Sequence, residues 1–130
     1  MDINEHIDYW IKTAEEDLVA AEAMFIAEKY NWCLFIGHLV LEKTLKAHFV
    51  LANNDVPPKT HDLVRLSKKT NLELTEEQID ILERVNSFNM EARYPEEKFS
   101  FYKQCTKEYT ELNFNQIKEL FQWLKSNLKY

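Results

Sequence analysis

Three titratable side chains recur every four residues inside an otherwise apolar segment, residues 32–52 (WCLFIGHLVLEKTLKAHFVLA). They are His38, Glu42 and Lys46. On a helix of 3.6 residues per turn, this spacing places them along one stripe. Charged groups on a helix that is apolar on nearly every face are costly unless they are paired or face a cleft. The stripe is therefore either a solvated helix edge with an ordinary Glu42–Lys46 pair, or a polar site at a helix–helix or subunit interface.

Other polar residues stand where helices are expected to begin or end. His61 and Asp62 stand at the start of a short apolar pattern, where Asp62 in the first turn is favoured by the helix dipole and Thr60 or His61 completes the cap. Arg93 and Tyr94 stand at the end of a helical pattern, where an arginine commonly interacts with the dipole or with a carboxylate. Asp17 taken alone reads as a solvated residue. Each residue has a structural explanation beside a functional one.

The residue types used in enzyme catalysis do not form a known pattern in this chain. There is no HExxH, no Glu-x-x-His and no glycine-rich loop that could hold a phosphate. The two cysteines, Cys33 and Cys105, lack metal-ligand spacing and are expected to be reduced, buried thiols. We therefore predict no catalytic residue, no metal site and no cofactor. The histidines are scattered along the chain, at His6, His38, His48 and His61.

Composition limits the class of protein. A chain of 130 residues suits a single domain, residues 1–130, and its one glycine and three prolines leave little turn chemistry for a sheet. The net charge of −6 argues against DNA binding. The first residues, MDINEHID, are too polar for a secretory signal, and residues 32–52 carry too much charge to span a bilayer. A cytoplasmic helical protein is expected.

Apolar periodicity predicts an all-α, up-and-down bundle of four main helices with a short extra helix. Gly37 inside the second helix suggests close approach by another helix. Thr60 is expected to cap the short helix, and Thr75 with Gln78 forms a capping box for the next one. The main helices are expected at about residues 3–28, 32–52, 76–94 and 107–128, and residues 95–106 are expected to form an irregular, packed loop.

The ordered set of polar and aromatic residues resembles the HEPN domain family over about residues 9–125. A proline-containing loop before the histidine–aspartate pair and an Ala-Arg-Tyr-Pro sequence before the last helix make the set fairly specific. The residues that carry the resemblance are Tyr9-Trp10, Ala14, Asp17-Leu18, Ala21, Tyr30, Glu42-Lys43, Lys46-Ala47, His61-Asp62-Leu63 and Ala92-Arg93-Tyr94-Pro95.

The resemblance implies a compact helical bundle that is usually a homodimer. Many family members are encoded beside a minimal nucleotidyltransferase, in some cases as toxin–antitoxin pairs, and nucleotide binding has been proposed for the family. One branch comprises ribonuclease toxins with an arginine followed a few residues later by a histidine. Here no histidine follows Arg93 at that distance, because the next residues are YPEEKFS. The ribonuclease motif is therefore not carried over.

The sequence thus favours a non-catalytic HEPN-domain protein that binds a nucleotide or serves as the substrate-binding partner of a nucleotidyltransferase. In this hypothesis Arg93 contacts phosphate, because a guanidinium suits bidentate oxyanion pairing. Lys43 and Lys46 add positive charge, Glu42 orients a cation, and Tyr94 stacks on a base. His38, His61, Asp62 and Asp17 complete the candidate cluster. The alternatives are a ribonuclease toxin with an atypical base and a dimeric interaction module whose polar network binds nothing.

Overall fold

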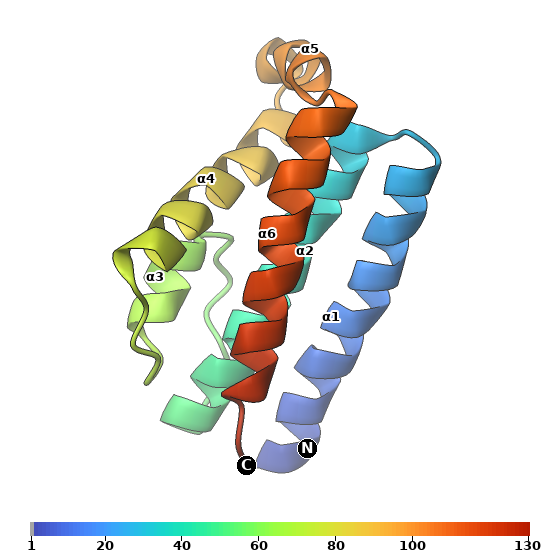
Figure 1. Cartoon of the computed structure of the whole chain (residues 1–130). Helices are drawn as coiled ribbons and strands as arrows, with labels where there is room; N and C mark the ends of the chain where they lie inside the picture. Colours follow the sequence, from blue (N-terminus) through green and yellow to red (C-terminus); the bar gives the residue numbers. More distant parts are fainter. Residues whose placement is uncertain (1) are drawn as a thin grey trace.

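The computed structural model describes residues 2–130, which fold into a helical bundle with four long helices and two shorter ones (Figure 1). The long helices are the main up-and-down helices that the sequence predicts. All regular secondary structure within residues 2–130 is helical, and no β-strand is present in that range. The helices are α1 (Ile3–Ile26), α2 (Tyr30–Asn53), α3 (Leu63–Lys68), α4 (Glu76–Arg93), α5 (Pro95–Gln104) and α6 (Lys107–Ser126).

Helices α1 and α2 form an antiparallel pair. The side chain of Asp2 accepts a hydrogen bond from the Glu5 backbone N–H at 2.8 Å and so caps the first turn of α1. The buried residues of α1 are Ile7, Ala14 and Ala21, whose seven-residue spacing keeps them on one face. Because two of the three are alanines, α1 can lie close against α2.

Helix α2 is the centre of the bundle, since it contacts all five other helices. Gly37 allows one of these contacts. A Cβ atom at this position would lie 2.8 Å from Cδ1 of Ile117 on α6. The close helix approach that the sequence predicts at the only glycine is confirmed, and α6 is the helix that makes it.

Helices α3 and α4 confirm one predicted cap and correct the other. At the start of α4, Thr75 and Gln78 form the predicted reciprocal capping box. The prediction that Thr60 caps α3 is wrong, because the N-cap is Asp62, whose Oδ1 accepts from the Arg65 N–H at 3.1 Å. Thr60 instead accepts from the Asp62 N–H at 3.2 Å. Asp62 is the cap because its carboxylate lies directly before the first turn and has the charge that the helix dipole favours.

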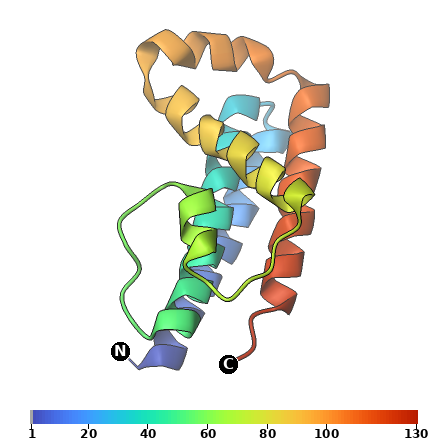
Figure 2. The ribbon, with the colours of Figure 1, turned by 90° about the vertical axis from the view of Figure 1, so that its left-hand side faces the viewer.

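The prediction of an irregular loop at residues 95–106 is also wrong, because residues 95–104 form α5. A proline is compatible with the first turn of a helix, and Glu96 and Glu97 place negative charge at the positive end of the dipole. Among residues 96–104 of this helix only Phe101 is fully buried, with its ring 5.6 Å from that of Phe88. A single inward residue gives no apolar period, so the sequence pattern did not show the helix. Figure 2 shows α5 crossing the end of the bundle.

Helix α6 returns along the bundle and brings the two ends of the chain together (Figure 1). The hydroxyl of Tyr130 donates a hydrogen bond to Asp8 near the start of α1. The buried thiols of Cys33 and Cys105 are free, as expected, and burial raises the pKa of each to about 12. Within residues 2–130, no helix combines the length and the apolar character needed to cross a membrane.

Candidate functional site

The stripe of titratable residues on α2 is buried. His38, Glu42 and Lys46 expose 0%, 5% and 9% of their surfaces. The interpretation of the stripe as a solvated helix edge is therefore wrong. These residues lie in the interior because α2 is covered by neighbouring helices on most sides, so their polar atoms need partners within the protein.

Glu42 is the centre of a network of hydrogen bonds. Its Oε2 accepts from Nζ of Lys46 at 3.0 Å, one helical turn away. Its Oε1 accepts from Nδ1 of His61 at 2.8 Å, across the loop that follows α2. The Lys46 ammonium also lies 5.3 Å from the centre of the Trp10 ring on α1, which is within the range of a cation–π contact. Both oxygens of the buried carboxylate therefore have a donor inside the protein.

His38 is a neutral imidazole with one unused ring nitrogen. Its Nε2 donates to the backbone carbonyl of His61 at 2.8 Å, which fixes the tautomer because a carbonyl can only accept. Its Nδ1 is 3.8 Å from Oε1 of Glu42, too far for a hydrogen bond, and has no other partner among residues 2–130. Burial lowers the pKa of His38 below its ordinary value, although the Glu42 charge opposes this shift. Complete burial keeps His38 from reaching a substrate.

His61 is the exposed member of the network. Its side chain is 55% exposed, and Glu42 holds its Nδ1. This orients the ring so that Nε2 is the nitrogen available to a ligand. A carboxylate that orients an imidazole in this way is also found where a histidine acts as a general acid or base.

The N-terminus of α3, which follows His61, is hydrogen-bonded to α4. The side chain of Asn86 accepts from the Leu63 N–H at 2.8 Å and donates to Asp62 at 3.0 Å. Partial burial raises the pKa of Asp62, but hydrogen bonds from Arg65 and Asn86 outweigh this effect and hold the pKa below its ordinary value. Asp62 therefore has a structural task, and it positions the chain that carries His61.

Asp17 and Lys43 form a separate ion pair between α1 and α2. The Lys43 Nζ lies 2.7 Å from the Asp17 carboxylate, and both side chains are about a quarter exposed. The expectation that Asp17 is merely solvated is therefore wrong. The pair ties α1 to α2, and it commits the Lys43 charge to a carboxylate.

Arg93 is placed differently from the other candidates. It is exposed at the end of α4, and its guanidinium carbon lies 5.8 Å from the centre of the half-exposed Tyr94 ring. It forms no ion pair with Glu42 or with any other carboxylate of the described part of the chain. After burial, which is the main cause, its charge makes a small contribution to lowering the pKa of His38. Arg93 is thus an exposed cation at the α4–α5 junction, without an ion-pair partner in the described part of the chain.

Two contributors to this site were absent from the sequence hypothesis. Trp10 covers the Lys46 ammonium, and Asn86 fixes the segment that carries His61. Asn86, Asn89 and Arg93 follow one another at helical spacing, which gave a weak signal for a polar face on α4. Among residues 2–130 no group of three or more histidine, cysteine or acidic side chains is arranged to hold a metal ion.

Comparisons with known proteins agree on one family. A sequence model of the HEPN domain matches residues 7–127. The fold is similar to TT1696 from Thermus thermophilus, with a TM-score of 0.80 and 14% identity over 93% of this chain and 97% of that one. It is also similar to ST0689, an archaeal HEPN homologue, with a TM-score of 0.67 and 21% identity over 95% of this chain and 98% of that one. No curated protein sequence matches significantly.

Proposed function

The chain belongs to the HEPN domain family, and we propose that it is a non-catalytic nucleotide-binding module that uses the junction of α4 and α5. In this proposal Arg93 binds a phosphate and Tyr94 stacks on the base. The Glu42 network holds His61, whose free ring nitrogen Nε2 accepts a hydrogen bond from the ligand.

The state of Arg93 is the observation that carries the proposal. An exposed guanidinium with no carboxylate partner in the described part of the chain keeps its bidentate donors available for an oxyanion. The Tyr94 ring beside it is 49% exposed and offers an aromatic face. A nucleotide presents both a phosphate and a π-face, so this pair suits a nucleotide better than it suits a ligand with only one of these features.

The other cations of the hypothesis have a smaller part. Lys43 is paired with Asp17, and Lys46 is buried against Glu42 and Trp10. We therefore assign neither lysine to direct phosphate contact. Lys43 ties α1 to α2, and Lys46 supports Glu42, which holds His61. The phosphate affinity rests on Arg93.

Titration with ATP tests this proposal by isothermal calorimetry. Loss of a charge-assisted bidentate contact is worth about 1.5–3 kcal/mol, so Arg93→Ala should weaken ATP binding at least about tenfold. Arg93→Lys, which keeps the charge and loses the fork, should lie between the two. The matched control is Lys12→Ala, an exposed cation on α1, which should bind as the wild type does. Equal affinities for wild type and Arg93→Ala would refute the assignment.

A nucleotidyltransferase is the partner that we propose for this module, acting as the catalytic subunit to which it presents a nucleotide or a substrate. Family membership supports this proposal, including its form as a toxin–antitoxin pair. A small nucleotidyltransferase in the adjacent reading frame would strengthen it. Co-expression of the two chains should then yield a complex on gel filtration, and two separate peaks would argue against it.

A second candidate function is ribonuclease activity with His61 as an atypical general acid or base. The observation that favours it is the Glu42–His61 hydrogen bond, which leaves an exposed imidazole nitrogen. Purified protein incubated with RNA should then cleave it, and both His61→Ala and Arg93→Ala should abolish cleavage. Cleavage that survives His61→Ala would exclude this candidate.

We also propose that the protein forms a homodimer through the face next to Arg93. Phe99 and Tyr102 of α5 are 64% and 63% exposed, and Lys98 lies 5.2 Å from the ring of nearby Trp32. Exposed aromatic clusters of this kind are typical of interfaces. Light scattering should give a dimer that Phe99→Ser dissociates, whereas Leu112→Ser on α6, similarly exposed, should not. A wild-type monomer would refute the proposal.

A further inference from the structure

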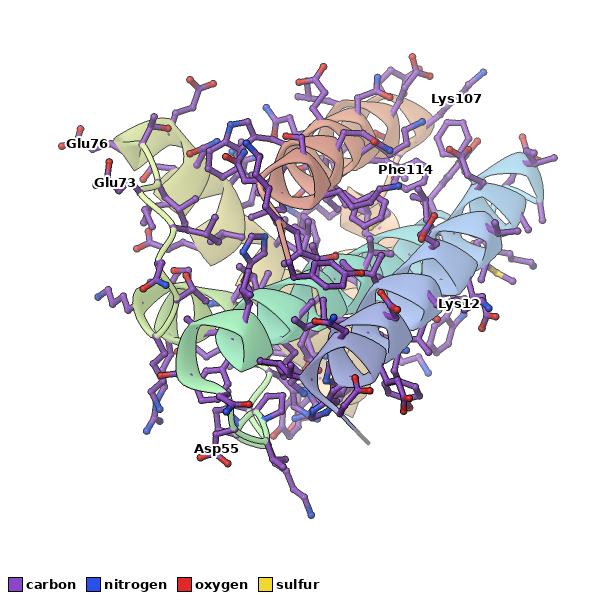
Figure 3. All side chains as sticks on the ribbon, turned by 90° about the horizontal axis from the view of Figure 1, so that it is seen from below. Lys12, Asp55, Glu73, Glu76, Lys107 and Phe114 are labelled. Atoms are coloured by element: carbon purple, nitrogen blue, oxygen red, sulfur yellow. The ribbon has the colours of Figure 1, made fainter. Side chains whose placement is uncertain are left out.

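A cavity of about 420 Å³ lies at the end of the bundle away from Arg93, between the ends of α2 and α6 and the α3–α4 connection. Its polar lining comprises His48, Asn71, Glu73, Trp123 and Asn127. Seen from below, Glu73 stands at the edge of the molecule on the side away from Lys12 of α1 (Figure 3). The volume of the cavity lies in the range of small-molecule sites. No part of the proposed nucleotide site touches it.

Hydrogen bonds hold the walls of this cavity. Asn53, the last residue of α2, donates from its side chain to the backbone carbonyl of Lys69 at 2.8 Å, which fixes the α3–α4 connection. His48 donates from Nε2 to the carbonyl of Leu124 at 2.8 Å, which joins α2 to α6. The side chain of Asn127 donates to the Trp123 carbonyl at 2.9 Å. The cavity is therefore preformed by contacts between three separate elements.

These same bonds leave the lining rich in hydrogen-bond acceptors. His48 is only 5% exposed, and because Nε2 carries the proton, Nδ1 is an acceptor with no partner among residues 2–130. Burial lowers the pKa of His48, which keeps the ring neutral. The amide nitrogen of Asn127 is already used, so its oxygen is the free group. Glu73 adds an exposed carboxylate at the rim.

The charged side chains that line the two hollows beside Trp123 are all acidic. This half-buried indole also lines a second hollow of about 240 Å³, on the side where α4 meets α6. Glu77 and Glu119 line that hollow. Of the side chains described, no lysine or arginine lines either hollow. An indole among carboxylates and neutral acceptors attracts a cation that carries several N–H donors.

We propose that this cavity binds a guanidinium group, which stacks on Trp123 and donates to Glu73, Asn127 and His48. A guanidinium fits better than an ammonium, because its planar face matches the indole and its five donors match the spread of acceptors. The group is carried either by a small free alkylguanidine or by an arginine side chain of a partner chain. The site does not depend on the nucleotide proposal.

Nuclear magnetic resonance titration tests this proposal through the indole N–H signal of Trp123. The probes are agmatine, N-acetylarginine methylamide and, as the neutral isostere, N-acetylcitrulline methylamide. Both guanidinium probes should shift the signal saturably with a Kd at or below about 1 mM, and the citrulline probe should not. Tighter agmatine binding would identify a free small molecule, and tighter arginine binding would identify a partner chain.

Matched variants separate this site from general charge attraction. Glu73→Gln should weaken both guanidinium probes about twofold to fivefold, as expected for an exposed carboxylate. Glu83→Gln, an exposed acid of α4 that lines neither hollow, should leave binding unchanged. The proposal is overturned by absence of a saturable shift, by an equal response to the citrulline probe, or by equal losses in the two variants. Because both acids are exposed, neither variant endangers the fold.

Discussion

Replacing Lys46 by methionine tests whether the Glu42 network is a desolvated charge pair. The Lys46 and Glu42 side chains are 11% and 6% exposed, and their charged atoms are 3.0 Å apart. At an effective dielectric constant of about 20, two unit charges at that distance attract by roughly 5 kcal/mol. Lys46→Met removes this attraction, but Glu42 stays buried with only His61 as donor. Breaking a buried pair costs about 3–5 kcal/mol, and the remaining His61 bond places our expectation near 3 kcal/mol.

Urea unfolding followed by circular dichroism measures this loss directly. A loss of about 3 kcal/mol corresponds to a fall in Tm of about 10 °C for a chain of this size. The matched control is Lys12→Met, which removes an exposed lysine of α1 and should change the free energy of unfolding by less than about 0.5 kcal/mol. The double variant Lys46→Met with Glu42→Leu should lie within about 1 kcal/mol of the wild type, because no charge is left buried without a partner.

Either of two results would show that Glu42 and Lys46 are not a desolvated charge pair. If Lys46→Met were as stable as the control variant, the pair would be solvated in spite of its burial. If the double variant were less stable than the single one, the loss would come from packing against Trp10 and not from the unpaired carboxylate.

Three further expectations concern packing, pH and capping. Gly37→Ala gains about 1 kcal/mol in helix propensity, but its Cβ would lie 2.8 Å from Cδ1 of the buried Ile117, so we expect a net loss of at most about 1 kcal/mol. Adding Ile117→Val, which removes that atom, should restore most of the loss. Burial lowers the pKa of both His38 and His48 below the value of 6.5 in the unfolded chain, so the unfolded chain binds more protons when the pH drops below about 6.5. The free energy of unfolding should therefore decrease below that pH, by up to about 1.4 kcal/mol per pH unit for each ring. Urea titrations that show equal stability at pH 7.5 and 5.5 would contradict this. Thr75→Ala removes the α4 capping box and should cost about 1 kcal/mol in a thermal melt.

The bundle could be predicted from the sequence because its long helices have clear apolar periods and recognisable ends. The capping box at Thr75 and the close neighbour of Gly37 both follow from local chemistry. Helix α5 could not be predicted in this way. Of its side chains at residues 96–104 it buries one completely, Phe101, and it lies across the end of the bundle instead of along it (Figure 2). Its helical form follows from its proline start and first-turn charges more than from a buried face.

The candidate cluster could be predicted in part. The four-residue spacing of His38, Glu42 and Lys46 correctly placed them on one stripe, but their burial depends on which helices cover α2. Local sequence patterns also could not predict which residues pair with Glu42. Glu42 pairs with His61 from a loop and not with Arg93, which stays exposed. Such choices depend on how the α2–α3 connection returns along the bundle, and no short-range pattern contains that information.

The most direct test of the nucleotide proposal is a titration of the uniformly ¹⁵N-labelled wild-type protein with ATP, followed by amide chemical shifts. We expect saturable shifts concentrated at the end of α4 and the start of α5, around Arg93 and Tyr94, with a smaller effect at His61. Shifts confined to the cavity beside Trp123, or no saturable shift at millimolar ATP, would contradict it.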